Sequence, residues 1–136
     1  MIVLIEGPTA AGKTTLARDL ARRFNLAYLH EGPPPVDVPA LAHYGHLLDE
    51  ARYRLEGTGR GTVFDRFARG ERVYGPLVRA RDGLGADGWR VFSRLLAAVG
   101  ARQVLCLPSR AACRASWTSS GRGAHGVVND VTMFNA

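Results

Sequence analysis

The sequence predicts a three-layer α/β fold, with a parallel sheet of about four to five strands flanked by helices. Short runs rich in branched apolar residues, typical of strands buried on both faces, alternate with stretches in which apolar residues recur at helical spacing. Such alternation indicates parallel strands joined by right-handed helical crossovers. A length of 136 residues fits one domain, so we treat residues 1–136 as a single unit.

Four strands are expected from the apolar runs. Each run is short, and polar or proline residues stop it. The first, third and fourth resemble the buried strands of a parallel sheet. The runs cover residues 2–5, 27–30, 62–64 with Asp65 at the end, and 104–107 before Pro108.

Helices are expected between and after these strands. The segment 32–39 contains too many prolines for regular structure and is predicted to be a loop. For 127–136, the end of a strand and the start of a helix both remain open. The predicted helices are 13–24, 41–55 with Pro39 near its start and Gly57 just beyond its end, 76–81, 89–99 with Asp87 as cap and Gly100 as stop, and 111–117.

Composition and charge exclude several classes of protein. Apolar residues make up 46% and charged residues 22%, which excludes intrinsic disorder. Two cysteines are too few for a disulfide scaffold, and the apolar opening is too short for a signal peptide or a membrane span. We therefore expect a cytoplasmic protein without membrane contact. The net charge of +6 favours anionic partners such as nucleotides or nucleic acid.

The first loop carries the strongest motif. It matches G-x-x-x-x-G-K-[ST] and lies between a predicted strand and a predicted helix. Backbone N–H groups at the start of that helix would converge on phosphate oxygens. The motif predicts binding of ATP with Mg²⁺, and the expected contacts are Gly7, Pro8, Thr9, Ala10, Ala11, Gly12, Lys13, Thr14 and Thr15.

Two side chains of the loop have distinct expected roles. Lys13, the only lysine among eighteen basic residues, would bridge the β- and γ-phosphates as a compact point charge. The Thr14 hydroxyl would ligate Mg²⁺. Thr15 is expected in the first helical turn, near the α-phosphate.

Further candidates lie where later strands end. Asp65 closes the third strand and would face the ligand crevice, where it would orient a magnesium water or the transferred phosphate. Arg66 follows it and is a candidate for binding an acceptor phosphate. Glu31 follows the second strand and, by similarity to deoxynucleoside kinases, is the candidate general base if the acceptor is a hydroxyl.

These residues show a resemblance to a known family. Asp65-Arg66-Phe67 with Tyr74 resembles the D-R-[YFH] motif of thymidylate kinases and the related phage deoxynucleotide kinases. Together with residues 5–15 and 30–33, the resemblance covers roughly residues 1–122. It implies a P-loop kinase fold and thymidylate-like activity. It also implies that Arg66 grips the acceptor phosphate and that Tyr74 packs against the deoxyribose.

The same resemblance implies further contacts. Phe67 and Arg69 would line the acceptor site, and a lid over the ATP phosphates would occupy about residues 108–125. Arg114 and Arg122 are its candidate arginines. Members of the family are commonly dimers, which makes a homodimer one expected assembly.

Several positions depart from the family pattern. Thr9 stands where an acidic residue is common, and Ala10 replaces the usual glycine. Gly70 and Gly75 replace a common serine and glutamine. The departures affect the thymine side of the resemblance and leave the ATP half intact.

Alternative functions stay open at this level. The acceptor could be a hydroxyl, on a deoxynucleoside or on 5-hydroxymethyluracil within DNA. A non-catalytic regulatory module that binds nucleotide is a second alternative. The first loop also resembles that of tRNA dimethylallyltransferases, but prolines 33–35 stand where that family needs an aspartate-centred motif.

The chain is short for the resembling kinases, which continue through a further helix and strand. We therefore expect either a pared-down kinase or a chain that ends early. An early end would leave a sheet edge exposed or covered by a partner.

Overall fold

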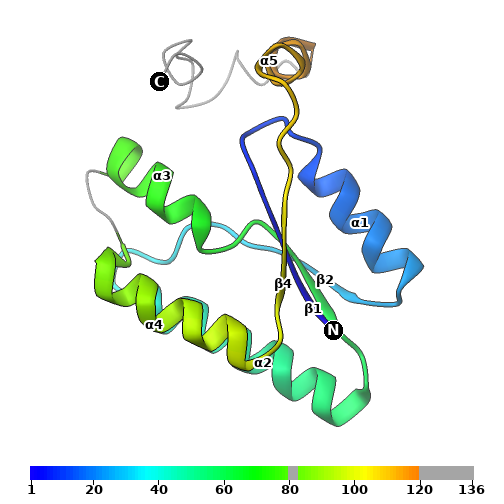
Figure 1. Cartoon of the computed structure of the whole chain (residues 1–136), viewed down its shortest axis with the longest axis vertical. Coiled ribbons are helices and arrows are strands. Elements are labelled where there is room, and N and C mark those ends of the chain that lie inside the picture. The colour runs from blue at the N-terminus through cyan, green and yellow to red at the C-terminus, as the bar shows by residue number, and fades with distance from the viewer. Residues whose placement is uncertain (80–82, 120–136) are drawn as a thin grey trace.

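A four-stranded parallel sheet forms the centre of the computed structural model, which describes residues 1–79 and 83–119 (Figure 1). The strand order is β2-β3-β1-β4, and each neighbouring pair runs parallel. The predicted parallel α/β architecture is confirmed. The strands are β1 (Ile2–Glu6), β2 (Ala27–His30), β3 (Thr62–Asp65) and β4 (Arg102–Leu105).

Helices cover the sheet in two layers. α1 lies on one side of the strands, whereas α2, α3 and α4 lie on the other (Figure 1). α5 lies beyond the end of the sheet at which β1 turns into α1. The helices are α1 (Lys13–Arg23), α2 (Ala40–Thr58), α3 (Arg69–Arg79), α4 (Gly85–Ala98) and α5 (Arg110–Ser119).

Strand β1 shows how the sequence pattern produces this arrangement. All five of its residues are buried. Ile2 and Leu4 pack into the cluster with α2 and α4, while Val3 and Ile5 pack into the cluster with α1. Successive side chains of a strand point to opposite faces, so a strand covered on both sides needs a continuous apolar run.

Strand β4 corrects the prediction of a fourth buried strand at 104–107. It spans Arg102–Leu105 and is largely exposed, because it lies at the edge of the sheet and pairs only with β1 among the described strands. Leu105 is 57% exposed and Leu107 is 72% exposed. An apolar run is therefore compatible with an edge position here.

Helix boundaries differ from prediction at α2 and α4. α2 continues through Gly57 and stops at Gly59, whose φ is 69° and whose N–H donates to the Leu55 carbonyl at 2.9 Å. Gly59, and not Gly57, thus adopts the left-handed conformation that ends the helix. α4 begins at Gly85, so Asp87 lies in its first turn instead of capping it.

Helix α3 begins seven residues earlier than predicted. Pro76, expected in its first turn, lies inside it. The backbone N–H of Arg69 donates to Oε1 of Glu6 at 3.0 Å, so a carboxylate from β1 satisfies a donor at the start of this helix. Glu71 in the first turn adds a favourable interaction with the helix dipole.

The described helices are short or polar relative to the apolar core of a bilayer. Within residues 1–79 and 83–119, none is long and apolar enough to cross a membrane.

Candidate functional site

The glycine-rich loop occupies residues 7–12, between β1 and α1. Gly7 has a φ of 143°, and a Cβ at this position would overlap the carbonyl oxygen of Cys106. The Cys106 N–H donates to the Glu6 carbonyl at 2.8 Å. Glycine at position 7 therefore permits the chain after β4 to pack directly against the end of β1.

The loop leads into a helix start suited to an anion. Gly12, the residue preceding α1, has a φ of 79°, and Ala10 has a φ of 63°. A left-handed non-glycine residue costs roughly 1–2 kcal/mol, which marks Ala10 as a strained position in the loop. α1 has no side-chain cap and no acidic residue in its first turn. Its first N–H groups thus remain suited to a phosphate.

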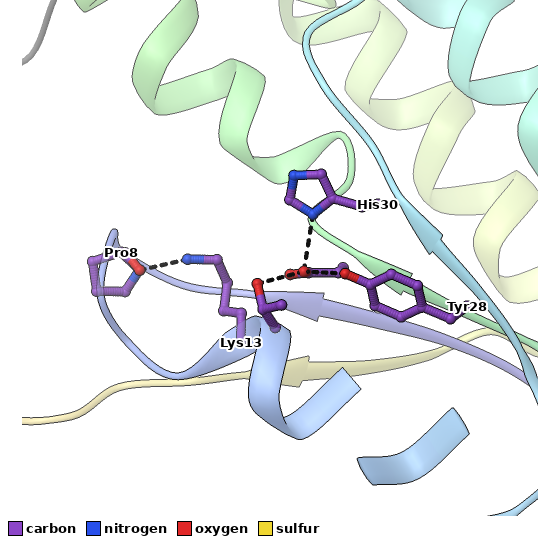
Figure 2. Close-up of polar contacts among 6 residues, drawn as sticks. Pro8, Lys13, Tyr28 and His30 are labelled. Atoms are coloured by element: carbon purple, nitrogen blue, oxygen red, sulfur yellow. Dashed lines mark hydrogen bonds and ion pairs between the residues drawn. The ribbon is translucent and has the colours of Figure 1, made fainter. Parts of the chain in front are cut away.

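Lys13 is buried at the start of α1. Its Nζ donates to the Pro8 carbonyl across the loop at 2.5 Å (Figure 2). Burial lowers the pKa of Lys13, and Arg66 lowers it further, while Asp65 opposes that shift. The ammonium thus lies within the loop where the motif predicts it, with the charge of Arg66 acting on it.

Asp65 receives three hydrogen bonds on one carboxylate oxygen. Thr14 Oγ1 donates to Oδ2 at 2.6 Å, Tyr28 Oη donates at 2.9 Å, and His30 Nδ1 lies 2.9 Å away (Figure 2). The Asp65 side chain is fully buried, and its other oxygen, Oδ1, is buried with no hydrogen-bond partner among the described residues. Three separate segments, the start of α1, β2 and β3, converge on this carboxylate.

Electrostatics favour the charged form of Asp65. Burial alone raises the pKa of this carboxyl, but hydrogen bonds from Thr14, His30 and Tyr28 together outweigh burial and lower it. Burial and the hydrogen bond to Asp65 raise the pKa of Tyr28. Asp65 is thus a carboxylate that accepts, and the Tyr28 hydroxyl is a donor.

The residues fit the predicted magnesium ion. Oδ1 of Asp65 offers an oxygen that has no other partner, and the Thr14 hydroxyl gives its proton to Oδ2, which leaves its lone pairs for a cation. No group of three or more His, Cys, Asp or Glu side chains lies together among the described residues. This donor set suits Mg²⁺, which keeps several waters and shares substrate phosphates.

Arg66 adopts a strained backbone directly after Asp65. Its φ is 76°, its side chain is exposed, and its N–H donates to the Ile5 carbonyl at 3.0 Å. A left-handed arginine persists only where its surroundings hold it, and such residues cluster at functional sites. The N–H of Glu31 donates to the Asp65 carbonyl at 3.3 Å, so Glu31 also lies beside this turn.

Glu6, the last residue of β1, binds the start of α3, just after the Arg66 turn. Its carboxylate is 6% exposed and accepts from the N–H of Arg69. Burial raises the pKa of Glu6, and hydrogen bonds from the backbone of Arg69 and Phe67 oppose the shift. Glu6 thereby links the strand before the glycine loop to the start of α3.

Other predicted contacts have different outcomes. Phe67 is 3% exposed and packs against Phe64 with ring centroids 4.6 Å apart, so its ring lies in the core, and its predicted contact with substrate stays a prediction. Arg69 Nε donates to Oε1 of Gln103 on β4 at 2.5 Å.

The remaining predicted residues stay predictions. Thr15 is exposed in the first turn of α1, and Arg114 is exposed on α5, within the predicted lid. Tyr74 lies on α3, but its side chain is not among those described. Arg122 lies outside the described residues.

Tyr28 and His30 are site residues that sequence reasoning missed. They are two positions apart on β2 and both reach Asp65. The signal was available in the spacing, because alternate residues of a strand share a face. Recognising it required the register of β2 and β3, in which His30 pairs with Asp65.

A cavity lies between the proline-rich loop and α3. Its volume is about 320 Å³, and Pro34, Val36, Pro39 and Glu71 are among its lining residues. The two segments that line the cavity both start near Asp65. The proline-rich loop follows His30, and α3 follows the Arg66 turn. Glu71 is 5% exposed, and the Tyr44 hydroxyl donates to its Oε1 at 3.4 Å.

Comparison with known proteins places the fold. No family model and no curated protein matches the chain. The solved YorR protein of Bacillus subtilis, in complex with phosphorylated GDP, aligns with a TM-score of 0.71 at 17% identity, over 89% of this chain and 67% of its own. Deoxyadenosine kinase of M. mycoides with bound dCTP aligns at 14% identity with a TM-score of 0.48, over 90% and 71% of the two chains.

The likeness to YorR shows a shared fold. With the glycine loop between β1 and α1 and the parallel sheet flanked by helices, the chain has the predicted three-layer α/β fold.

Proposed function

We propose that this protein is a Mg²⁺-dependent kinase that transfers the γ-phosphoryl group of ATP to a deoxynucleoside monophosphate. The observation that carries the proposal is the junction of the glycine loop with Asp65, where Thr14 donates to Asp65 at 2.6 Å beside the buried Lys13. Nucleotide as ligand is further supported by YorR, which has this fold and was solved with phosphorylated GDP.

The donor half of the proposed site consists of the glycine-rich loop, Lys13 and Asp65. Backbone N–H groups at the start of α1 and the Lys13 ammonium bind the phosphates of ATP. Thr14 and Asp65 hold the metal ion, which neutralises charge on the phosphates when it is bound. For phosphoryl transfer, positioning and charge neutralisation supply most of the catalysis.

The acceptor half consists of Arg66, Glu31, the proline-rich loop and α3. The Arg66 guanidinium binds the acceptor's phosphate and brings its oxygen in line with the γ-phosphorus. A new P–O bond forms to that oxygen as the bond to the β,γ-bridging oxygen breaks, and ADP leaves. We place the acceptor's base in the 320 Å³ cavity, whose prolines and valine supply apolar walls. Thymidylate is the first acceptor to test, from the sequence resemblance.

A hydroxyl acceptor is the second candidate. Its support is the backbone hydrogen bond that holds Glu31 beside Asp65, because a hydroxyl benefits from a general base and a phosphate does not. A deoxynucleoside and 5-hydroxymethyluracil within DNA both provide such a hydroxyl. The net charge of +6 is compatible with DNA.

We also propose a homodimer as the assembly in solution. β4 leaves Leu105 and Leu107 exposed, and a second copy is one way to cover them.

The test is a product assay with Mg·ATP. Each deoxynucleoside, each deoxynucleoside monophosphate and hydroxymethylated DNA is incubated separately, and phosphorylated products are identified by mass. Products from monophosphates only support the main proposal, whereas products from nucleosides or DNA support the second candidate. ATP binding without transfer to any acceptor would indicate a non-catalytic nucleotide-binding module and overturn both.

A further inference from the structure

We propose that Tyr28 and His30 are positioning residues that hold Asp65 so that Oδ1 alone is presented to the divalent cation. The proposal rests on the proposed function for the presence of that cation. It assigns a role to two β2 side chains that the donor and acceptor halves described above do not use.

The register of the sheet brings the two side chains to Asp65. β2 and β3 pair in parallel with His30 opposite Asp65, and Tyr28 lies on the same face of β2, two residues earlier. Both reach Oδ2 at 2.9 Å, and Figure 2 shows them approaching it from the β2 side while Lys13 lies on the far side, at the loop. Asp65 is thus held between α1 and β2.

Hydrogen-bonding capacity explains why this arrangement selects one oxygen. A carboxylate has two oxygens, each with about two lone pairs. Three donors converge on Oδ2, which saturates it, whereas Oδ1 is buried without a partner in the described part of the chain. Rotation of the carboxylate would exchange the two oxygens. Donors fixed on a strand oppose that rotation more firmly than Thr14 alone, because Thr14 also has to serve the cation.

A merely structural role would give a different result. In that case Tyr28 and His30 would join β2 to the site and contribute only to folding. The His30 side chain is half-exposed, so it contributes little to the core. The two roles separate in an assay of cation affinity, because a structural defect lowers stability without a selective effect on the metal.

The experiment uses Tyr28→Phe, His30→Ala and His30→Asn in the full chain. Tyr28→Phe removes the donor and keeps the ring, over which Arg18 lies at 5.6 Å. Asparagine retains an N–H near the place of Nδ1, so His30→Asn should rescue what His30→Ala loses. Mn²⁺ binding to the protein with a non-hydrolysable ATP analogue is measured by electron paramagnetic resonance, and nucleotide affinity is measured in EDTA.

Matched controls exist on α2. Tyr53 is 65% exposed and also lies beneath an arginine, Arg52, at 5.2 Å. His46 is exposed and lies 3.3 Å from the carboxylate of Glu50. Tyr53→Phe and His46→Ala therefore change the same groups away from the site and should leave Mn²⁺ affinity unchanged.

We expect Tyr28→Phe and His30→Ala to weaken Mn²⁺ binding by about 10-fold or more, the usual effect of removing groups that orient a metal ligand. Affinity for the nucleotide in EDTA should change less than about twofold, and His30→Asn should recover most of the loss. Unchanged Mn²⁺ affinity in folded Tyr28→Phe and His30→Ala, or equal loss in the His30→Asn variant, would overturn the proposal. Wild-type protein that binds Mn²⁺ with nucleotide but transfers no phosphate would refute the kinase function alone, and absence of Mn²⁺ binding would refute both.

Discussion

The donor half and the acceptor half of the site are built in different ways. The donor half consists of one continuous loop between the buried strand β1 and the helix α1, with the fully buried Asp65 beside it. The acceptor half depends on a strained turn at Arg66, a proline-rich loop and the start of α3, and Glu6 on β1 accepts a hydrogen bond from the start of α3. In the proposed site the phosphate-binding loop is local in sequence, whereas the placement of Asp65 and of the acceptor half depends on tertiary contacts.

The strongest way to test this division is Lys13→Ala. Loss of the ammonium should reduce phosphoryl transfer by roughly 10²–10³-fold, as for other charge-stabilising donors. Lys13→Arg should fail as well, because a planar guanidinium does not replace a compact ammonium. Single-turnover product formation measures the effect, and Arg22→Ala on the exposed face of α1 is the control. Full transfer by Lys13→Ala contradicts the proposed donor half.

Arg66→Ala should affect the acceptor half selectively. Removing a charge-assisted contact is expected to raise KM for the acceptor by about 10–100-fold and leave KM for ATP nearly unchanged. Arg66→Gly should show the same rise in KM for the acceptor. Its free energy of unfolding should exceed that of Arg66→Ala by about 1 kcal/mol, because glycine tolerates a φ of 76°. Steady-state kinetics and urea denaturation measure the two effects. An equal rise in both KM values would argue against separate halves.

Glu6→Ala tests the connection between the halves. Loss of the carboxylate removes the acceptor for the Arg69 N–H at the start of α3, and we expect destabilisation of about 1–2 kcal/mol. Glu6→Gln keeps an oxygen in place and should cost much less. Urea denaturation provides the measurement, with Glu50→Gln on the exposed face of α2 as control. Equal destabilisation by Glu6→Ala and Glu6→Gln would show that charge, and not the hydrogen bond, matters.

The same contrast explains what could be predicted from sequence. β1, β2, β3 and α1 were identifiable because apolar runs and helical spacing record burial directly. Strand β4 was predicted as buried because its apolar run resembles an interior strand, and only the strand order reveals an edge. The start of α3 was missed because the group that satisfies it, Glu6, is far away in sequence.

The same contrast between local signals and tertiary contacts applies to the residues of the candidate site. Lys13, Thr14 and Asp65 were found because motif and strand ends are local signals, and the structure brings Thr14 and Asp65 into contact. Tyr28 and His30 were missed because their role requires the register of two strands. The place of Phe67 in a motif does not show which way its ring points; the ring lies in the core, and its contact with substrate stays a prediction.

The smallest expected effect is a difference in pH dependence between the carboxylates of the two halves. Burial raises the pKa of Glu6 above its ordinary value of 4.5, so its contribution to stability is present below pH 4.5 and is lost as pH rises through the folded-state pKa. The net effect of burial and hydrogen bonds lowers the pKa of Asp65 below 3.8. Its contribution is therefore present above pH 3.8 and is lost as pH falls through the folded-state pKa.

The two carboxylates should thus change stability with opposite sign and in different windows. Relative to wild type, Glu6→Gln should gain stability as pH rises above 4.5, whereas Asp65→Asn should gain as pH falls below 3.8. Urea denaturation from pH 3 to pH 7.5 measures both differences, with Glu50→Gln as the surface control. Parallel stability curves for wild type and both variants would show that neither carboxylate changes its proton affinity on folding. A shift in Asp65→Asn alone would assign the pH-dependent part of the stability to the donor half, because Glu6 would then serve α3 through its hydrogen bond only.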